Sequence, residues 1–298
     1  MIFIKQKSDV FIQDGWDEVS IKKMIEKCAR VSYKSEDKIA DDSYIKFVDN
    51  LIARDHARPL EFGTVYLTIP KFIDSKYNIG SADTILFYQN NPYSKVCIKD
   101  YDAYITTNYR VIVEYKNFDD LKYLTPPTKY HEQRYYIKFI TNQAVMNEYR
   151  THITLSHLAE SSRYCNYGRD KFASQITYII PGCNYLNKLE EGEYHYDDID
   201  GMCKGPKGVS FMDPQTKLWQ IVEWSYLNLI KAGHTAQEAA LVLTKNTKSE
   251  LISCGFKNAW DNFFYRRCDV SAHPMARQLA IETKKKFNNI IEKISDQK

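Results

Sequence analysis

The sequence has no continuous stretch of about 18 apolar residues, the length that a membrane-spanning helix requires. Its apolar start, MIFIKQKSDVFI, is too short and too interrupted by charge for a signal peptide. The charges nearly cancel, with 41 Lys and Arg against 38 Asp and Glu, a net charge of +3. This balance gives no reason to expect a nucleic acid or an anionic membrane as the partner. We therefore expect a soluble, cytoplasmic protein.

Paired cysteine motifs are also absent. The 7 cysteines are scattered, with no CxxC pair and no Cys/His spacing suited to zinc. Reduced thiols and no metal site are therefore expected. Internal repeats and low-complexity tracts are missing as well, which argues against a solenoid or a disordered chain.

Hydrophobic periodicity points to an α/β (α+β) fold. With 44% hydrophobic and 14% aromatic content, the 298 residues can bury a sizeable core. Residues 17–28 and 41–53 carry apolar side chains at helical spacing, and residues 64–70 and 135–140 alternate as strands do. We expect a central mixed sheet flanked by helices.

The whole chain reads as one domain over residues 1–298, with insertions at about 71–132 and 184–212. Both segments are irregular in pattern, and the second contains the acidic run EEGEYHYDDIDG. Helices are predicted over residues 214–232 and 274–294, and Thr235 with Glu238 forms a capping box for a helix between them.

Three segments carry residues suited to chemistry. A helix over 142–151 should bring Glu148 and His152 to one face, because positions four apart are neighbours on a helix. The turn that follows offers hydroxyls and a guanidinium, which suit a phosphate monoester. These are Ser161, Ser162, Arg163 and Tyr164. Taken alone, the pattern also fits a structural surface pair.

The second segment, residues 258–274, places polar side chains around Phe263 and Phe264. An arginine beside aromatic rings can stack on a planar base or donate to its carbonyl oxygens. The alternative is a helix end with buried phenylalanines and solvated arginines. The polar residues are Asn262, Arg266, Arg267 and His273.

The third segment, DHARPLEFGTV, contains His56 and Glu61 at the entry to a strand. Loops in that position commonly supply site residues. A lone histidine there is more often structural than catalytic.

Taken in order and spacing, the three segments resemble the flavin-dependent thymidylate synthases. The family pattern is R-H-R-x7-S followed by x-R-Y, with an upstream H-x-x-x-x-E-H and a downstream N-x-x-x-x-R and later His. The match is closest over ESSRYCNYGRDKF and covers most of the chain outside the two insertions.

This resemblance implies roles for individual residues. The turn residues Ser161, Ser162, Arg163 and Tyr164 would hold the substrate nucleotide, and Glu148 would contact the pyrimidine. Arg267 would be catalytic, contacting the pyrimidine and helping to ionise its N3. His56, His152 and Asn262 would contact the cofactor. The implied cofactor is FAD, with NADPH and methylenetetrahydrofolate as co-substrates, in a homotetramer whose active sites lie between subunits.

Several basic residues of the family pattern are missing here. Thr151 and Ile153 stand where both arginines of R-H-R belong, Ala240 replaces an arginine that reaches the phosphate, and Phe62 replaces a histidine. Each lost charge-assisted contact is worth about 1.5 to 3 kcal/mol, so the expectation of FAD is weakened unless other groups compensate. Candidates to replace the arginines are Arg58, Arg150 and Arg266.

The leading functional hypothesis is C5 methylation of dUMP or a related pyrimidine nucleotide. The alternative is a diverged nucleotide-binding homologue with an altered substrate or reaction, or a non-catalytic subunit that assembles with a paralogue. A third hypothesis, a thymidylate synthase with Cys183 as nucleophile, lacks the basic surroundings that would activate a thiolate.

Overall fold

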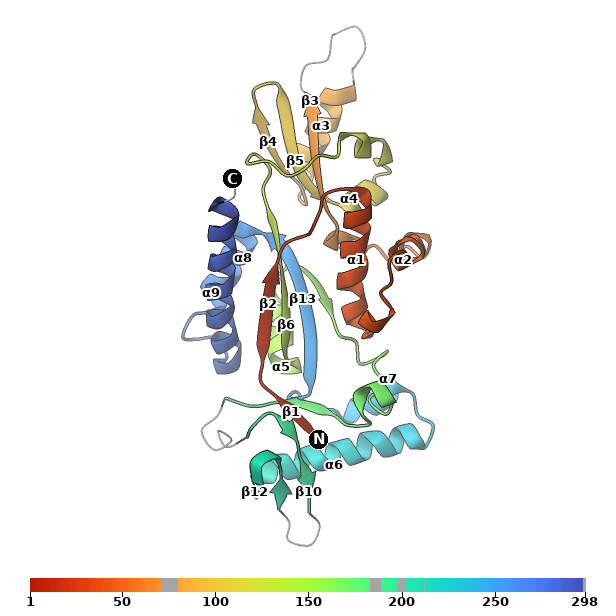
Figure 1. Ribbon diagram of the computed structural model, residues 1–298, viewed down its shortest axis with the longest axis vertical. Helices are drawn as coiled ribbons and strands as arrows, with labels where there is room; N and C mark the ends of the chain where they lie inside the picture. The colour runs from red at the N-terminus through yellow and green to blue at the C-terminus, as the bar shows by residue number, and fades with distance from the viewer. Residues whose placement is uncertain (71–79, 183–188, 198–201, 209, 212, 297–298) are drawn as a thin grey trace.

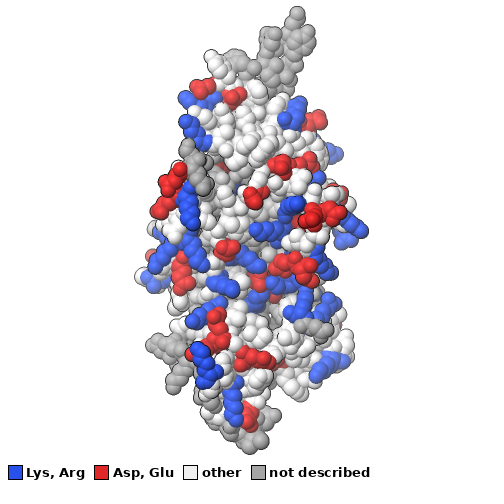
Figure 2. All heavy atoms as spheres, in the orientation of Figure 1, with Lys and Arg blue, Asp and Glu red and all other residues white. Residues whose placement is uncertain are grey.

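The structure is a computed structural model that describes residues 1–70, 80–182, 189–197, 202–208, 210–211 and 213–296. Figure 1 shows an elongated molecule with a long sheet in its middle, a smaller sheet towards one end and helix α6 near the other. Lys and Arg side chains are interspersed with Asp and Glu on the face seen in Figure 2. Cys183 lies outside the described residues, as do parts of both predicted insertions.

The middle of the molecule is a four-stranded sheet in the order β2-β6-β13-β7. All of its pairings are antiparallel. Its strands are β2 (Lys7–Phe11), β6 (Arg134–Asn142), β7 (Ser156–Ala159) and β13 (Lys248–Phe256). Strand β13 is buried along nearly its whole length because helices cover both faces of the sheet.

Alternation along the central strands divides their side chains between two helical layers. Ile137 and Leu251 pack with α8 (Lys257–Arg267) and α9 (Pro274–Asp296). Tyr136, Ile252 and Cys254 point to the other face and pack with α1 (Glu18–Tyr33). Figure 1 shows α1 and α9 on opposite sides of the sheet. Residues two apart on a strand share a face, so this arrangement follows from the sequence pattern.

The expected α/β class is confirmed, with one difference in the pairing. The central sheet is antiparallel, and mixed pairing occurs instead in a small sheet of order β8-β1-β9. There β1 (Ile2–Ile4) pairs parallel with β8 (Thr177–Ile179) and antiparallel with β9 (Gly192–Glu193). The long central strands pair antiparallel because none is joined to its neighbour in the sheet by a parallel crossover.

The strand predicted over 64–70 forms, but in a sheet of its own. This sheet has the order β3-β5-β4. Its strands are β3 (Thr64–Pro70), β4 (Lys95–Lys99) and β5 (Asp102–Asn108). The helices near it are α2 (Ser43–Ala53), α3 (Gly80–Asn90) and α4 (Tyr109–Glu114). Alternation predicted a strand there but carried no information about which sheet it joins.

The third part of the fold contains α6 (Pro214–Lys231), which matches the predicted helix over 214–232. Gly233 follows it with φ +94°, the left-handed conformation that glycine tolerates at a helix end. The predicted capping box of Thr235 and Glu238 is confirmed at the start of α7 (Ala236–Ala239). A hairpin sheet lies nearby, with strands β10 (His195–Tyr196), β11 (Cys203–Lys204) and β12 (Ser210–Phe211).

Short 3-10 helices connect these elements. They are η1 (Glu36–Lys38), η2 (Arg58–Phe62), η3 (Phe118–Tyr123), η4 (Asp170–Phe172), η6 (Pro206–Gly208) and η7 (Ala240–Val242). Within the described part of the chain, no helix is both long and apolar enough to cross a membrane.

Candidate functional site

Arg267, the last residue of α8, is the most extensively bonded arginine near the predicted site. Its Nη1 donates to Glu148 Oε2 at 2.5 Å, and its Nη2 donates to the Glu148 carbonyl at 2.6 Å and to Thr151 Oγ1 at 2.8 Å. Its Nε donates to His152 Nε2 at 2.8 Å. The planar guanidinium has its donors in a fixed fork, so these bonds fix its orientation. The segment after α5 (Gln143–Tyr149) is therefore tied to the end of α8.

The bond from Arg267 fixes the protonation of His152. Because Nε2 accepts a proton donor, the neutral ring must carry its own proton on Nδ1. Burial, reinforced by the charge of Arg267, lowers the pKa of His152 to about 4. At neutral pH the ring is therefore an uncharged acceptor for the guanidinium.

These residues line a cavity of about 440 Å³, here called the Arg267 pocket. It brings together four of the predicted site residues, Glu148, His152, Asn262 and Arg267. Its other lining residues are Thr151, Ile153, Thr154, Arg266, Ser271, Ala272 and His273. Ile153 is 92% exposed, which is unusual for an isoleucine.

A second cavity, of about 380 Å³, is here called the Ser161 pocket. It contains the other predicted binding group, Ser161, Ser162 and Arg163. It is also lined by Ser32, Arg58, Gln143, Met146, Arg150, His157, Leu158, Ala159, Glu160, Tyr167 and Ser249. The turn is anchored because the Ser161 amide donates to the Ser32 carbonyl at 3.0 Å and the Glu160 amide to the Glu250 carbonyl at 2.7 Å.

Helix α5 separates the two pockets. Gln143, Met146 and Arg150 are three and four residues apart, share one side of the helix and line the Ser161 pocket. Glu148 and His152 are four apart and line the Arg267 pocket. Arg150, the C-cap of α5, lines the Ser161 pocket, whereas Thr151, the next residue, lines the Arg267 pocket.

A buried network of charges supports the floor of the Ser161 pocket. Lys248 lies between Glu160 at 2.8 Å and Glu250 at 2.6 Å. Glu250 also pairs with Lys34 at 2.7 Å and Lys138 at 2.8 Å. Burial alone would raise the pKa of Glu250, but the three lysines outweigh it and hold that pKa well below its usual range. Each buried carboxylate is thereby compensated, as burial requires.

His157 connects the two pockets. Its Nε2 lies 2.9 Å from the His152 carbonyl, which only accepts, so Nε2 carries the proton and Nδ1 accepts from Ser253 Oγ at 2.8 Å. Burial is the main cause that lowers the pKa of His157 to about 4. The bond to His152 opposes this shift, and the charges of Arg150 and Arg58 reinforce it.

Two predicted residues lie apart from both pockets. His56 is exposed and lines neither cavity. Tyr164 is 54% exposed and packs against Tyr33, with ring centroids 5.1 Å apart. Glu61 of the same upstream segment as His56 pairs with Arg110 at 2.5 Å. The predicted nucleotide-binding set is thus divided, because Glu148 and Arg267 share one pocket and residues 161–163 share the other.

Sequence reasoning missed His157 and Gln237. The period of two in SHLA places His157 and Ala159 on the same face of β7, and this signal could have identified His157. Gln237 Oε1 accepts from Arg163 Nε at 3.1 Å, a contact between distant segments that no local pattern indicates.

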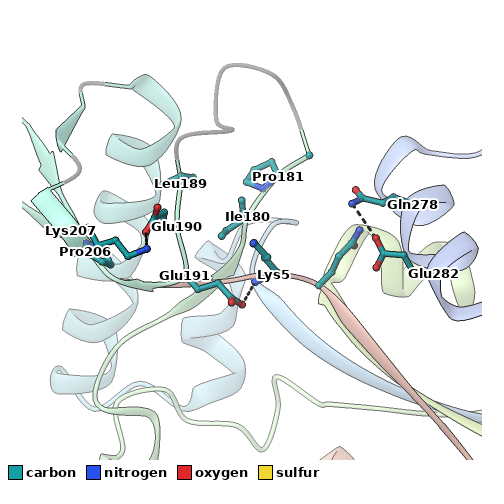
Figure 3. Close-up of a pocket in the computed structure, with 12 residues that line it drawn as sticks. Lys5, Ile180, Pro181, Leu189, Glu190, Glu191, Pro206, Lys207, Gln278 and Glu282 are labelled. Atoms are coloured by element: carbon teal, nitrogen blue, oxygen red, sulfur yellow. Dashed lines mark hydrogen bonds and ion pairs between the residues drawn. The ribbon is translucent and has the colours of Figure 1, made fainter. Parts of the chain in front are cut away.

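A cavity of about 680 Å³, larger than either of these two pockets, is elsewhere and contains none of the predicted residues. Figure 3 shows it between the start of the chain, the Ile180 segment and α9. Among its charged groups, Lys207 pairs with Glu190 at 2.9 Å and Glu191 accepts from the Lys5 amide at 2.8 Å.

The family described as thymidylate synthase complementing protein, the flavin-dependent thymidylate synthases, matches residues 131–291, more than half of the chain. The chain belongs to this family. The matched range includes α5, the Ser161 turn and α8 but not His56 or Arg58. Membership makes the protein a methyltransferase-type enzyme of the thymidylate synthase class.

Among solved structures, the chain is similar to a UMP/dUMP methylase PolB from Streptomyces cacaoi, in crystals bound with 5-Br UMP and with 5-Br dUMP. The identities are 13% and 12%, both with a TM-score of 0.41. The alignments cover 97% of this chain and 92% and 93% of those chains. No curated protein matches the chain described here significantly.

The Arg267 pocket has polar side chains suited to a flavin, the cofactor of this family. Within the described residues, no hydrogen bond or ion pair engages the side chains of Asn262, Arg266 or His273, which all line it. Such free polar groups fit the carbonyl and nitrogen edge of a flavin ring. Thr151 and Ile153 line the same pocket and carry no charge for a pyrophosphate. Asn262 and His273 thus offer polar groups suited to a flavin ring, and Arg266 is a cation in the same pocket.

Proposed function

We propose that this protein is a flavin-dependent thymidylate synthase-like enzyme. It methylates C5 of dUMP or a related pyrimidine nucleotide, with methylenetetrahydrofolate as the carbon donor and NADPH as the source of reducing equivalents. The single observation that carries the proposal is the family match over residues 131–291. This range contains α5, the Ser161 turn and α8, which contribute residues to the two pockets. The site assignments below extend it residue by residue.

In this proposal Arg267 is the catalytic residue and Glu148 contacts the pyrimidine. A cation beside a uracil ring stabilises its ionised N3, because an opposite charge within about 4–6 Å favours the charged form. Electron density then moves to C5, which forms a bond to the methylene carbon as the bonds from that carbon to the folate nitrogens are broken, and C5 later loses its hydrogen as a proton. The fork that holds Arg267 against Glu148 and Thr151 orients the guanidinium before the substrate enters.

The nucleotide phosphate is assigned to Ser161, Ser162 and Arg163, with Tyr164 beside them. Hydroxyl and guanidinium donors give short, charge-assisted bonds to phosphate oxygens. His152, Asn262 and His56 are assigned to the cofactor. Both His152 and Asn262 line the Arg267 pocket, and the free side chain of Asn262 supports its assignment. When bound, a reduced flavin would supply the hydride that completes the methyl group.

One assay tests the enzymatic proposal directly. The purified full chain is incubated with FAD, NADPH, methylenetetrahydrofolate and dUMP tritiated at C5. Release of tritium to water together with formation of dTMP supports the proposal. Absence of both products, in a folded protein and with a known enzyme of the family active in parallel, would overturn it.

A second candidate function rests on one specific observation. The guanidinium of Arg267 is already engaged by Glu148, Thr151 and His152, and Thr151 and Ile153 have replaced two arginines of the family pattern. A diverged homologue with an altered substrate or reaction, or a non-catalytic subunit of a paralogue, would show this arrangement. Rescue of a thymidine-requiring strain by this chain alone would exclude the non-catalytic version.

We also propose a cytoplasmic homotetramer built from a single domain with the two insertions. Because the predicted nucleotide-binding residues are divided between two pockets, a second copy that brings complementary residues to each pocket would complete the site. The mass of the protein in solution, measured by light scattering, tests the assembly.

A further inference from the structure

Three arginines from separated segments line the Ser161 pocket. Arg58 comes from η2, Arg150 follows α5 as its C-terminal cap, and Arg163 belongs to the serine turn. All three residues are exposed at the surface of the cavity. The chain folds segments that are about a hundred residues apart in sequence so that they contribute cations to one small space.

None of these guanidiniums pairs with a carboxylate among the described residues. Arg163 donates to the neutral amide of Gln237 at 3.1 Å and lies over the ring of Tyr164. In contrast, Arg30 and Arg110 pair with Glu26 and Glu61 at 2.6 and 2.5 Å. Arg30 and Arg110 are therefore neutralised by carboxylates, whereas the three arginines of the Ser161 pocket have no carboxylate partner in the described part of the chain.

The one carboxylate in the pocket does not cancel this charge. Glu160 is buried and already paired with Lys248 at 2.8 Å, and it accepts from Tyr167 at 3.3 Å. His157 adds no negative charge, and it lines the same cavity as Arg58 and Arg150, whose charges help to lower its pKa. The net charge facing the cavity is strongly positive.

Neutral donors complete the lining. Ser161 and Ser162 offer hydroxyls, and Gln143 offers an amide from the side of α5 that also carries Arg150. Guanidiniums with hydroxyl donors in a small cavity suit a compact oxyanion, because each oxygen can accept more than one bond. A phosphate monoester, which carries about −1.5 to −2 charge at pH 7, matches the lining better than a carboxylate does.

We propose that Arg58 and Arg150, together with Arg163, form the subsite for the dianionic phosphate monoester of the substrate. Arg58 and Arg150 thereby replace the arginines missing from the family pattern, and they do so in the Ser161 pocket. The identity of the ligand as a pyrimidine nucleotide rests on the proposed function. The anion subsite itself rests on the convergence of the three guanidiniums.

The positions of the lost arginines agree with this assignment. Thr151 and Ile153, which occupy those positions, both line the Arg267 pocket. Arg150 leaves the other side of α5 and lines the Ser161 pocket. The two family positions thus carry no charge in this chain, and Arg150 adds its charge to the pocket that holds Ser161, Ser162 and Arg163.

Calorimetric titration of the full chain tests the proposal with three probes, dUMP, deoxyuridine and inorganic phosphate. Each of Arg58→Ala and Arg150→Ala should weaken dUMP and phosphate binding by about 10-fold to 100-fold, the size of one charge-assisted contact. Neither should change deoxyuridine binding. Arg58→Lys and Arg150→Lys should recover part of the loss, because a lysine keeps the charge without the fork.

Arg54→Ala is the matched control, since Arg54 is an exposed arginine near Arg58 that does not line the pocket. Circular dichroism and thermal midpoints check folding of every variant. Binding of dUMP unchanged in Arg58→Ala and Arg150→Ala but lost in Arg163→Ala would overturn this inference and leave the proposed function standing. Arginine-dependent phosphate binding without dUMP binding would support the subsite and count against the proposed function.

Discussion

The guanidinium Nε of Arg267 donates to the imidazole Nε2 of His152 across 2.8 Å, which joins the end of α8 to the segment after α5. An arginine beside a histidine is stable only if the imidazole is neutral, because two cations at this distance repel. The burial of His152 meets that condition by disfavouring its charged form. The same bond therefore fixes the tautomer of one residue and the orientation of the other.

Replacing Arg267 should damage both stability and activity. Its side chain is 14% exposed and bonds to Glu148, Thr151 and His152. We expect Arg267→Lys to lower the free energy of unfolding by about 1.5 to 3 kcal/mol, because a point charge cannot make the forked contacts. Tritium release from dUMP should fall at least 100-fold, by analogy with the loss of other positioned electrostatic groups.

Urea denaturation and the tritium assay measure the two effects. Arg266→Lys is the control for stability, because Arg266 is exposed and should shift the free energy of unfolding by less than about 0.5 kcal/mol. Equal stability of the Arg267→Lys variant and the wild type would contradict the structural role described for the fork.

Two buried histidines predict how stability depends on pH. The pKa values of His152 and His157 are lowered to about 4 in the folded protein, against about 6.5 when unfolded. Between these values the unfolded state binds more protons, so stability rises with pH from about 4 to 6.5 and is lost as pH falls through that window. Each histidine contributes at most about 1.4 kcal/mol per pH unit.

Urea midpoints measured at intervals from pH 4 to 7 check this dependence. A His157→Gln variant keeps an N–H donor for the His152 carbonyl but does not titrate in this range. Its stability should therefore change with pH with a smaller slope than that of the wild type. An identical slope in the two proteins would show that His157 is not neutral and buried as described.

The charge network around Glu250 should be necessary for folding. Glu250 is 6% exposed in its side chain and pairs with Lys34, Lys138 and Lys248. Glu250→Gln leaves these cations without their shared partner, so we expect a loss of about 3 to 5 kcal/mol in the free energy of unfolding. Chemical denaturation measures the loss, and Glu114→Gln, which breaks the more exposed pair with Arg110, should cost less than about 1 kcal/mol.

Thiol reactivity should distinguish the cysteines. Cys97 is exposed, whereas Cys28 and Cys254 are fully buried, and burial is the largest cause that raises the pKa of both buried thiols. A thiolate is the reactive form, so a chromogenic disulfide reagent should modify Cys97 rapidly in the native protein. Cys28 and Cys254 should react only on unfolding, as peptide mapping can verify. Rapid native labelling of Cys254 would contradict the packing of α1 on the sheet.

The hydrophobic pattern of the sequence predicted the positions of helices and strands better than it predicted which strands pair. The helices α1 and α6 and the strand β6 follow from hydrophobic period and capping residues, and each forms close to where the pattern indicates. The pairing of strands did not follow. Residues 64–70 were expected in the central sheet but form β3 of a separate sheet, because pairing depends on distant partners that alternation does not identify.

The same limit applies to the site. The prediction that Glu148 and His152 lie together agrees with the cavity that they share, although α5 ends at Tyr149, before the predicted end at residue 151. Spacing could not reveal that Arg58 joins Arg150 or that Gln237 bonds to Arg163, since these contacts link distant segments. The assignments of His56, Tyr164 and the other site residues stay predictions until ligands are measured.

The position of α5 between the two pockets has a thermodynamic consequence. This helix of 7 residues contributes side chains to both cavities. A ligand that displaces the helix from one side would therefore change the shape of the cavity on the other side. By reciprocity, the factor by which one ligand alters the affinity of a second equals the factor in the opposite direction. We therefore expect that substitutions which change the packing of α5 alter the coupling between ligands in the two cavities.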